Sequence, residues 1–553
     1  STVGLTDQTL DPAASTSYAD IFDTSSLADN AYVNIYNADT GEKVANDDGD
    51  VWFQAGELAD LTFTSPAEGE TSQQWINMWM GGETSGWEDA VITGGEGEPV
   101  VPGETFTLTD SIDTVTGTSG NDTVIGDNDT ASLADTLDLG EGTDTVKLYG
   151  TATIPALNSV EAAEFFNLDT EDINTANSDS LETVTIKNST IDNGPGTIDV
   201  SLANGEALTL MNVDANAAGD GIALSTANAD ETVILNDVAG AAGAVDFDLD
   251  IGGSTTPITT LTLEGSTGSS DVDLIDGGLD LETLNLTGDA GIDVENDAIT
   301  SLLTITAAEN TAGVSITYNA ASDGTITGSA QDDTVTMESD NFDEDDTLDG
   351  GEGTDTLTIS HADADTNISG DLSVTNFETL GLMTDIGAAT SVDMDNVEGI
   401  TTVSISGTNT TGDADARHLL TDITSEATTV NFTGDGDDDD QAFDGVNMDW
   451  DSSSELDAVT VNISNDGTEG KEFVVYELNL TNVLDVTINA SDIGTATGEE
   501  LTIDQALDVS DAESLAIASN SDVVLTNGIT GSDDLEDVDT SDSDAGVDLG
   551  DII

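Results

Sequence analysis

From residue 105 onward, apolar and polar residues alternate along many short runs of the chain. Examples are ETVTIKN (182–188), ALTLMNV (207–213), TTLTLEG (259–265) and AVTVNIS (458–464). Alternation with a period of two predicts β-strands with one buried face, and the Val, Ile, Leu and Thr content of these runs also favours strands. Asn, Asp and Gly fill the short gaps, and few helical patterns intervene. The pattern therefore predicts an all-β fold of short, closely spaced strands.

Two architectures can accommodate such strands. A parallel β-solenoid stacks the apolar positions of successive strands inside a continuous core. Tandem antiparallel β-sandwiches are the alternative, because several strands follow one another at the spacing of about 8–12 residues that is typical of sandwiches. Tight Asn-Gly and Asp-Gly hairpin turns are few in this sequence. We therefore expect the parallel solenoid.

Residues 1–93 differ from the rest of the chain. They contain four of the five tryptophans and the strand-like runs 31–37, 59–64 and 74–80. The segment 94–104 follows, and its glycines and prolines predict a linker. The first 93 residues therefore predict a small N-terminal β-sandwich. An acidic turn between its first two runs contains Asp47, Asp48 and Asp50, which are candidate calcium ligands or simply solvated side chains.

A pair of similar segments indicates a duplication. DTLDLGEGTDTV starts at Asp135 and DTLDGGEGTDTL starts at Asp346, and a looser acidic motif lies upstream of each. Three pairs of acids share one offset (333 − 122 = 211): Asp122 with Asp333, Asp135 with Asp346, and Asp144 with Asp355. We therefore expect two solenoid units, 105–327 and 328–528, followed by an acidic C-terminal segment, 529–553.

The duplicated segments carry a family resemblance. Residues 350–358, GGEGTDTLT, fit the calcium-binding nonapeptide G-G-x-G-x-D-x-U-x, where U is a large apolar residue. Residues 103–124 are similar to the stretch that opens the repeat region of many bacterial S-layer proteins. The chain thus resembles RTX-type calcium-binding proteins that bacteria export by type I secretion, although each cluster has only two or three such units. The resemblance implies an RTX-like solenoid, a cell-surface location and a candidate secretion signal in 529–553.

Calcium takes about six to eight oxygen ligands, and glycine turns can supply carbonyl oxygens beside aspartate carboxylates. Carboxylates nine residues apart, such as Asp346 and Asp355, are expected to share an ion. The candidate ligands in the duplicated motifs are Asp122, Asp135, Asp138, Gly140, Gly142 and Asp144, and Asp333, Asp346, Asp349, Gly351, Gly353 and Asp355. The acidic loop 434–440 adds Asp435, Asp437 and Asp439, for which a solvated loop is the alternative.

The amino-acid composition limits the kinds of partner and binding site that the chain can have. The 553 residues include 114 acidic and 5 basic ones, a formal charge of −109. Such charge opposes compaction unless cations neutralise it, and it argues against nucleic acid as a partner. The absence of cysteine excludes disulfides and thiolate metal sites. No apolar run of about 18 residues predicts a transmembrane segment. Disorder would explain the charge, but 37% of the residues are hydrophobic and apolar residues alternate in many places. Adaptation to high salt would also explain the charge, but it does not predict nonapeptides at a fixed offset.

Catalytic motifs are absent from the sequence. The chain has two histidines, His361 and His418, and contains neither H-E-x-x-H nor G-x-S-x-G. We therefore expect no enzyme. We expect a secreted calcium-binding structural protein that assembles with itself into an S-layer or filament at the cell surface, with cell-surface polysaccharide as a further partner through calcium. The alternative is a calcium-dependent adhesin or biofilm-matrix protein whose N-terminal domain binds glycan.

Overall fold

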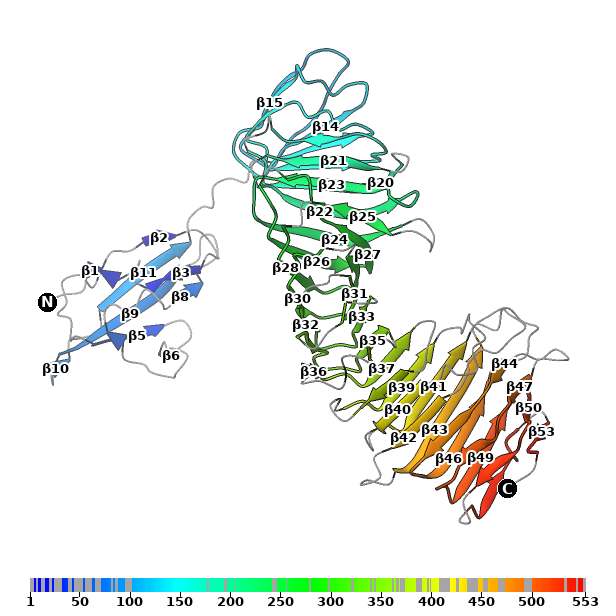
Figure 1. Cartoon of the computed structure of the whole chain (residues 1–553). Helices are drawn as coiled ribbons and strands as arrows, with labels where there is room; N and C mark the ends of the chain where they lie inside the picture. Colours follow the sequence, from blue (N-terminus) through cyan, green and yellow to red (C-terminus); the bar gives the residue numbers. More distant parts are fainter. Residues whose placement is uncertain are drawn as a thin grey trace. The chain divides into compact units, whose positions relative to one another are not determined.

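A computed structural model divides the chain into two compact units, Ser1–Pro102 and Gly103–Ile553 (Figure 1). The structure describes separate segments between residues 4 and 94 and most of 102–550. The longer gaps in the second range are 241–245, 369–372, 384–389, 407–417, 435–445, 451–455, 466–472 and 492–499. The remaining gaps in this range are one to three residues long.

The N-terminal unit is built on a mainly antiparallel seven-stranded sheet. Tyr18, Val33, Ile35 and Ile76 are buried in this unit. The strands of the sheet are β2 (Gln8–Leu10), β11 (Glu88–Gly94), β9 (Thr71–Met80), β5 (Tyr32–Asn37), β6 (Glu42–Lys43), β7 (Phe53–Gln54) and β10 (Glu83–Thr84). Two further pairs are β1 (Gly4–Leu5) with β4 (Phe22–Asp23), and β3 (Ser15–Ser17) with β8 (Thr62–Thr64).

The second unit is a parallel β-solenoid, as predicted. Its strands add one turn at a time to two long sheets. The 13-stranded sheet runs β12 (Thr105–Thr107), β14 (Thr123–Asp127), β16 (Thr145–Tyr149), β18 (Ala162–Phe166), β20 (Thr183–Ile191), β22 (Ala207–Ala215), β24 (Asp230–Gly240), β26 (Thr260–Thr267), β28 (Thr283–Gly288), β30 (Thr304–Asn310), β32 (Thr325–Thr327), β34 (Thr347–Asp349) and β36 (Ser373–Thr375).

The second long sheet has 16 strands and continues to the C-terminal end of the described chain. It runs β19 (Ile173–Asn174), β21 (Thr197–Leu202), β23 (Gly221–Thr226), β25 (Phe247–Asp250), β27 (Ser270–Ile275), β29 (Ile292–Asn296), β31 (Val314–Tyr318), β33 (Thr334–Met337), β35 (Thr356–Ser360), β37 (Thr379–Met383), β39 (Thr402–Ser406), β41 (Thr429–Gly434), β43 (Leu456–Asn465), β46 (Val483–Ala490), β49 (Ser514–Ser519) and β52 (Asp537–Asp539).

Three smaller sheets complete the turns. The first contains β13 (Thr114–Thr116), β15 (Thr136–Asp138) and β17 (Ala156–Asn158). The second contains β38 (Thr390–Asp393), β40 (His418–Ile423), β42 (Val446–Trp450), β45 (Leu478–Thr481), β48 (Leu507–Val509) and β51 (Ile529–Gly531). The third contains β44 (Phe473–Val475), β47 (Glu500–Ile503), β50 (Asp522–Leu525) and β53 (Val547–Asp548). The acidic segment 529–553 thus contributes strands to the solenoid.

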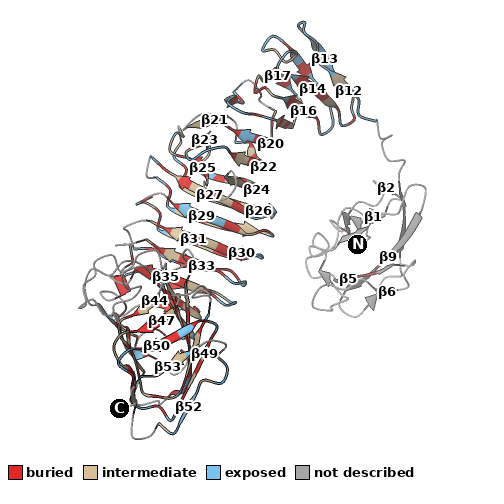
Figure 2. Cartoon of the chain, turned by 90° about the vertical axis from the view of Figure 1, so that its right-hand side faces the viewer, coloured by how far each residue is buried: buried red, intermediate tan, exposed pale blue. Residues whose placement is uncertain are grey.

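Apolar side chains stack inside the solenoid from one turn to the next. Val124, Val146, Ala163, Val184 and Leu208 occupy matching positions on five successive strands, and each is at most 1% exposed. Buried and partly exposed residues alternate along most strands (Figure 2). Each turn therefore buries the apolar face of the one before it, which is the main stabilising contribution in a stacked repeat. No helix in the described residues is long and apolar enough to cross a membrane.

Parallel pairing excludes the alternative of antiparallel sandwiches for this unit. The strand pairs described between β12 and β53 are parallel, with side chains of the same type often in register. Pairing also continues across residue 328, where Ser315 of β31 aligns with Thr334 of β33. The two solenoid units expected from the sequence are therefore stretches of one solenoid.

The duplicated motifs lie on different sheets of this solenoid. Asp122 and Asp144 directly precede β14 and β16 of the 13-stranded sheet, whereas Asp333 and Asp355 directly precede β33 and β35 of the 16-stranded sheet. The strands β14 and β33 are separated by an odd number of positions (33 − 14 = 19), and strands in this stretch contribute two to each turn. The second copy consequently lies half a turn out of phase with the first.

Candidate metal sites

A ladder of acidic residues runs along one edge of the 13-stranded sheet. Asp122, Asp144 and Glu161 directly precede β14, β16 and β18. The backbone N–H of Asp122 donates to Oδ1 of Asp144 at 2.7 Å, and the N–H of Asp144 donates to Oε2 of Glu161 at 2.7 Å. Because each carboxylate accepts a hydrogen bond from the turn before it, the ladder fixes successive acids one above another.

The two aspartates of this ladder are in different electrostatic states. Asp122 is 1% exposed, and its carboxylate accepts N–H donors from Glu104 and Thr118, both at 2.6 Å. Burial opposes ionisation of Asp122, but these donors outweigh it and lower its pKa. Asp144 is 0% exposed, and its Oδ2 atom has no hydrogen-bond donor. Burial and then repulsion from Glu161 and Asp122 raise the pKa of Asp144, although the Asp122 N–H opposes the rise.

The second motif repeats this arrangement on the other sheet. The N–H of Asp333 donates to Oδ1 of Asp355 at 2.7 Å, and the N–H of Asp355 donates to Oε2 of Glu378 at 2.8 Å. Asp333 accepts N–H donors from Val314 and Ser329, whereas Oδ2 of the fully buried Asp355 has no donor. Burial, followed by repulsion from the neighbouring acids, raises the pKa of Asp355 to about 6. Two separate stretches of the chain therefore each contain a buried carboxylate oxygen without a hydrogen-bond donor, in the same local arrangement.

Glycines leave space for backbone oxygens beside these carboxylates. Gly142 has a φ of +135°, and a Cβ there would lie 2.8 Å from the carbonyl oxygen of Gly120 and 3.1 Å from Oδ1 of Asp144. A Cβ on Gly140, where φ is +97°, would collide with the carbonyl oxygen of Thr118. These positions require glycine both for the left-handed backbone and for the close approach. We call this glycine turn, with the backbone carbonyls packed against it and the Asp144 carboxylate that follows it, a glycine cradle.

The second cradle has the same construction. Gly351 and Gly353 have φ values of +103° and +140°. A Cβ on Gly351 would collide with the carbonyl oxygen of Ser329, and one on Gly353 would lie 2.6 Å from the carbonyl oxygen of Gln331. A Cβ on Gly350 would lie 2.9 Å from the Oδ2 atom of Asp355 that has no donor. The vacant side of this carboxylate thus faces the glycine turn.

These backbone and side-chain oxygens suit calcium better than they suit a metal that binds side chains alone. No group of three or more His, Cys, Asp or Glu side chains in the described part of the chain is placed to hold a metal ion. A cation here would draw on backbone carbonyls together with Asp144 or Asp355, and calcium accepts such mixed oxygen ligands in flexible geometry. The residues present therefore fit a calcium ion at each glycine cradle.

The other aspartates of the motifs occupy different positions. Asp135 is buried and accepts the N–H groups of Asp113 and Ser132 at 2.9 and 2.8 Å, and Asp346 is buried and accepts the N–H of Gly324 at 2.7 Å. They precede β15 and β34, whereas Asp144 and Asp355 precede strands of other sheets. The expectation that acids nine residues apart share an ion is wrong, because half a turn separates them. The acids that meet are one turn, or 22 residues, apart.

Two predicted ligands lie outside the cradles. Asp138 is exposed at the end of β15, and Asp349, at the end of β34, accepts hydrogen bonds from the Gly351 N–H and the Asn376 amide at 3.2 and 2.8 Å. Asp349 therefore shapes the turn that contains Gly351. The remaining candidates, Asp47, Asp48, Asp50, Asp435, Asp437 and Asp439, lie outside the described residues.

Sequence reasoning missed the glutamates that end both ladders. Glu161 and Glu378 occupy the same place before a strand as the aspartates do, and each holds the N–H of the preceding aspartate. Neither belongs to a nonapeptide. Their distances from those aspartates are 17 and 23 residues, so a search at one fixed period does not find them. An acid directly before each run of alternating apolar residues is the signal that would have identified them.

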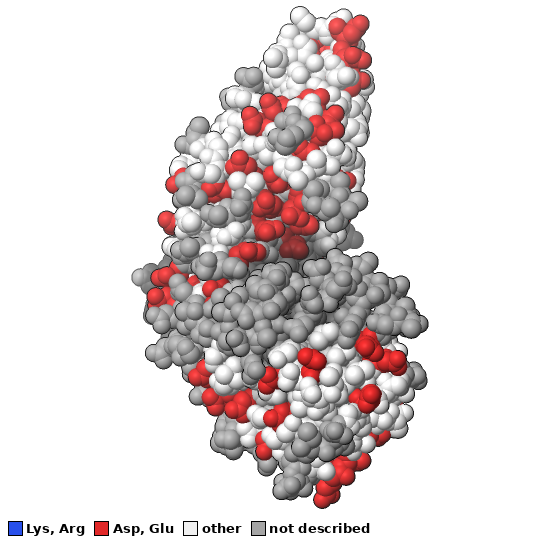
Figure 3. Space-filling model, turned by 45° about the vertical axis from the view of Figure 1, so that its right-hand side comes forward, with Lys and Arg blue, Asp and Glu red and all other residues white. Residues whose placement is uncertain are grey.

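Negative charge dominates the solenoid outside these sites. Figure 3 shows acidic side chains distributed over one face of the molecule, in agreement with the formal charge of −109. Carboxylates at this density repel one another and attract cations. The surface of the solenoid therefore carries a high density of carboxylates in addition to those of the two buried cradles.

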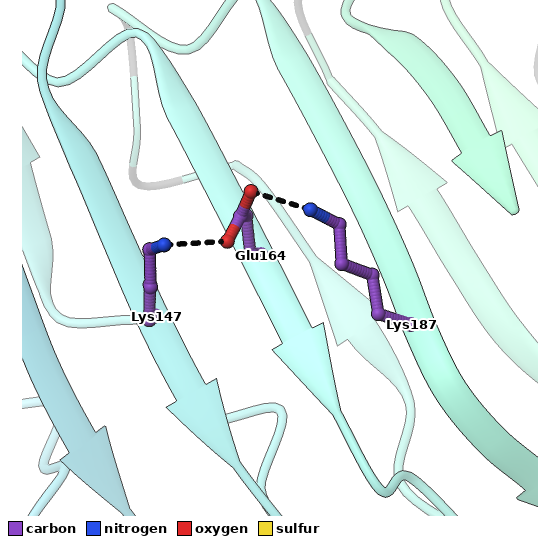
Figure 4. A network of polar contacts seen from close by, with 3 residues as sticks. All are labelled: Lys147, Glu164 and Lys187. Carbon is purple, nitrogen blue, oxygen red and sulfur yellow. Dashed lines mark hydrogen bonds and ion pairs between the residues drawn. The ribbon is translucent and has the colours of Figure 1, made fainter. Parts of the chain in front are cut away.

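Lys147 and Lys187 meet at one acid of the 13-stranded sheet. Glu164 on β18 lies between Lys147 on β16 and Lys187 on β20, with Nζ–O distances of 3.2 and 2.6 Å (Figure 4). Lys187 also lies 5.8 Å from the ring centre of Phe166, which stacks on Tyr149. Burial raises the pKa of Glu164, but hydrogen bonds and charge attraction from the two lysines outweigh it and lower the pKa. The cluster is satisfied within the chain and does not form a basic surface for a polyanion.

Comparison with known proteins leaves the function to be argued from the structure. The sequence matches no protein-family model, and no curated protein resembles it at a significant level.

Proposed function

We propose that this protein is an extracellular calcium-binding structural protein of the RTX type, exported by type I secretion, which folds in calcium and assembles with itself at the cell surface. The observation that carries the proposal is the pair of glycine cradles at Asp144 and Asp355. Each places a fully buried carboxylate, one oxygen of which has no hydrogen-bond donor, directly after a glycine turn that packs against backbone carbonyls of the adjacent turn. A buried, unpaired charge is costly, and a cation removes the cost.

Calcium couples to folding because the ligands come from different turns. The glycine turn before Asp144 packs against the carbonyl oxygens of Thr118 and Gly120 only when two turns of the solenoid have stacked. An ion that binds the folded form, and not the unfolded chain, stabilises it by about 2.7 kcal/mol per site when calcium is 100-fold above its Kd. Low calcium inside the cell would keep the acidic chain extended for export, and calcium outside would drive it to fold.

Calcium would also favour the proposed assembly, because it reduces the repulsion between copies. Two copies of a chain with a charge of −109 repel each other. Cations on the carboxylate-rich surface reduce that repulsion, and the stacked strands offer repeated faces for contact. A structural array fits this surface better than catalysis does.

Circular dichroism with metal exchange tests the proposal. We expect EDTA at low ionic strength to convert the β spectrum to that of a disordered chain, and calcium to restore it. Magnesium should restore it far less well, because it demands tighter octahedral geometry. A spectrum and a melting temperature that do not change with EDTA would overturn the calcium proposal and favour adaptation to salt.

A further inference from the structure

One stretch of the 16-stranded sheet carries two outward columns without charge, beside a column that contains the exposed Asp485; the first of the two columns reaches Asp539 on β52. Two columns of small polar or uncharged residues run across β35, β37, β39, β41, β43, β46 and β49. We call these residues the neutral face: Thr356, Thr379, Thr402, Thr429, Thr460, Thr487 and Ala516 in one column, and Thr358, Gly381, Ser404, Asn431, Asn462, Asn489 and Ala518 in the other.

The same sheet is strongly acidic a few turns earlier. Outward positions of β25, β27 and β29 carry Asp248, Asp273 and Glu295 in one column, and Asp271 aligns with Asp293 in the next. Burial and then repulsion from neighbouring acids raise the pKa of Asp271 to about 6. Identical strand geometry therefore supports a self-repelling surface at β25–β29 and two uncharged columns at β35–β49.

Hydrogen bonds order four residues in the second column of the neutral face, Ser404, Asn431, Asn462 and Asn489. The amide of Asn462 donates to Oδ1 of Asn431 at 2.9 Å, the amide of Asn489 donates to Oδ1 of Asn462 at 2.9 Å, and the amide of Asn431 donates to Oγ of Ser404 at 3.1 Å. The ladder engages one donor and one acceptor of Asn462, whereas an amide has two N–H donors and two oxygen lone pairs. A partner can use the remainder, and ordered side chains lose little entropy when it binds.

We propose that the neutral face pairs two copies of this chain, face to face, across a two-fold axis. The proposal rests on the self-assembly proposed above. Threonine hydroxyls and asparagine amides both donate and accept hydrogen bonds, so the face is complementary to itself, as a two-fold contact requires. An acidic face cannot pair with its copy in this way. The two columns contain no carboxylate, so pairing them brings no carboxylate of one column against a carboxylate of its copy.

The dimensions of this stretch of sheet allow a small contact. Seven strands about 4.8 Å apart and about five residues long at about 3.3 Å per residue cover roughly 500 Å² on each copy, and the two columns occupy about three residues of that strand length. A pair that uses the whole stretch would bury roughly 1,000 Å², the size of weak or transient interfaces. Thr429 and Asn431 lie on β41, the fourth of the seven strands, and therefore closest to the expected axis.

Charge placed on the face should separate the copies. We would compare the double variant Thr429→Asp/Asn462→Asp with a matched control, Thr283→Asp/Thr306→Asp, which adds the same charge at the same diagonal spacing to outward positions of the 13-stranded sheet. Sedimentation velocity of the full chain in calcium measures association, and circular dichroism checks folding. We expect association at least tenfold weaker for the first variant and unchanged for the control. Equal association of both variants would overturn the proposed face and leave the self-assembly intact.

Cross-linking gives a second, direct readout because the chain has no cysteine. A short bismaleimide should join copies of Asn431→Cys in calcium and fail to join copies of Thr306→Cys. Equal cross-linking at both positions would overturn the pairing. The pairing would also be overturned if the chain stayed monomeric and a neutral polysaccharide protected Asn431→Cys from the maleimide. A chain that folds with calcium but shows no association at any concentration would overturn both the pairing and the proposed assembly.

Discussion

The backbone N–H of Asp333 lies 2.7 Å from Oδ1 of Asp355, one turn further along the solenoid, while the second oxygen of Asp355 is buried and accepts no hydrogen bond. Asp122 and Asp144 stand in the same relationship on the other long sheet. One acid of each pair receives donors from the protein on both oxygens, whereas the other keeps one buried oxygen without a donor, the site at which we propose a cation. The two members should consequently respond in opposite ways to substitution.

The first prediction concerns this contrast. Asp355→Asn removes a buried charge, so we expect the free energy of unfolding in EDTA to rise by about 1 kcal/mol, while the stabilisation by calcium decreases. Asp333→Asn is the matched control. It weakens charge-assisted bonds from Val314 and Ser329 and should cost about 1.5–3 kcal/mol with or without calcium. Denaturant titrations of both variants measure these changes. Equal loss of stability for both in EDTA would contradict a cation site at Asp355.

The second prediction concerns pH in the absence of calcium. The pKa of Asp355 is about 6 in the folded chain, above its ordinary value of 3.8. Because the folded state holds this proton more tightly, its contribution to stability is fully present below pH 3.8 and is lost as the pH rises to about 6. Asp355→Asn should remove this part of the pH dependence. Thermal melts in EDTA at several pH values compare the two chains, and parallel curves would contradict the prediction.

Calcium should reverse that trend. Protons and calcium compete for the same carboxylate oxygens, so calcium affinity should fall as the pH drops below about 6. Calorimetric titration at pH 5.5 and pH 7.5 measures it.

The third prediction concerns the glycine turns. Gly353→Ala imposes a φ of +140° on alanine and places its Cβ 2.6 Å from the carbonyl oxygen of Gln331. We expect a loss of more than 1 kcal/mol in stability and weaker calcium binding. Gly277→Ala is the control, because its Cβ would meet nothing within 4 Å, and it should change stability by less than about 0.5 kcal/mol. Equal effects of the two substitutions would show that the turn at Gly353 needs no glycine.

Alternation in the sequence was sufficient to predict the solenoid strands and their inward faces. The run 182–188 becomes part of β20, and its apolar residues Val184 and Ile186 are both 0% exposed. The reason is physical: a strand with a period of two buries every second residue, whatever the partner strand is. The same run, however, does not say which sheet it joins.

The placement of the acids depended on information that is not local. The turns between Asp144 and Asp355 differ in length. Their combined length determines that Asp355 precedes a strand of a different sheet from the one that Asp144 precedes. Glu161 and Glu378 were missed for a related reason, since their spacings of 17 and 23 residues differ from the 22 of the aspartate pairs. The resemblance identified the glycine cradles, and the stacking of turns selected the acids that meet there.

The fourth prediction concerns the order in which assembly and fold are lost. In the proposed assembly, cations reduce the repulsion between copies from exposed acidic surfaces that surround the contact, whereas the cradles at Asp144 and Asp355 would hold them at buried carboxylates between two turns. Ions at contacts should therefore have fewer ligands and dissociate at lower chelator concentration. In a chelator titration followed by light scattering and circular dichroism together, scattering should fall first, and the β signal should fall later.

The double variant Asp144→Asn/Asp355→Asn separates the two processes. In this variant the calcium-dependent β signal should be lost at a chelator concentration closer to the one at which scattering is lost, because the buried sites no longer retain calcium. A neutral-face variant, Thr429→Asp/Asn462→Asp, should lower scattering at every chelator concentration and leave the β signal unchanged. If scattering and β signal of the unaltered chain fall at the same chelator concentration, the ions that join copies are not held more weakly than those that hold the turns. The proposed sequence of folding and then assembly would be wrong in that case.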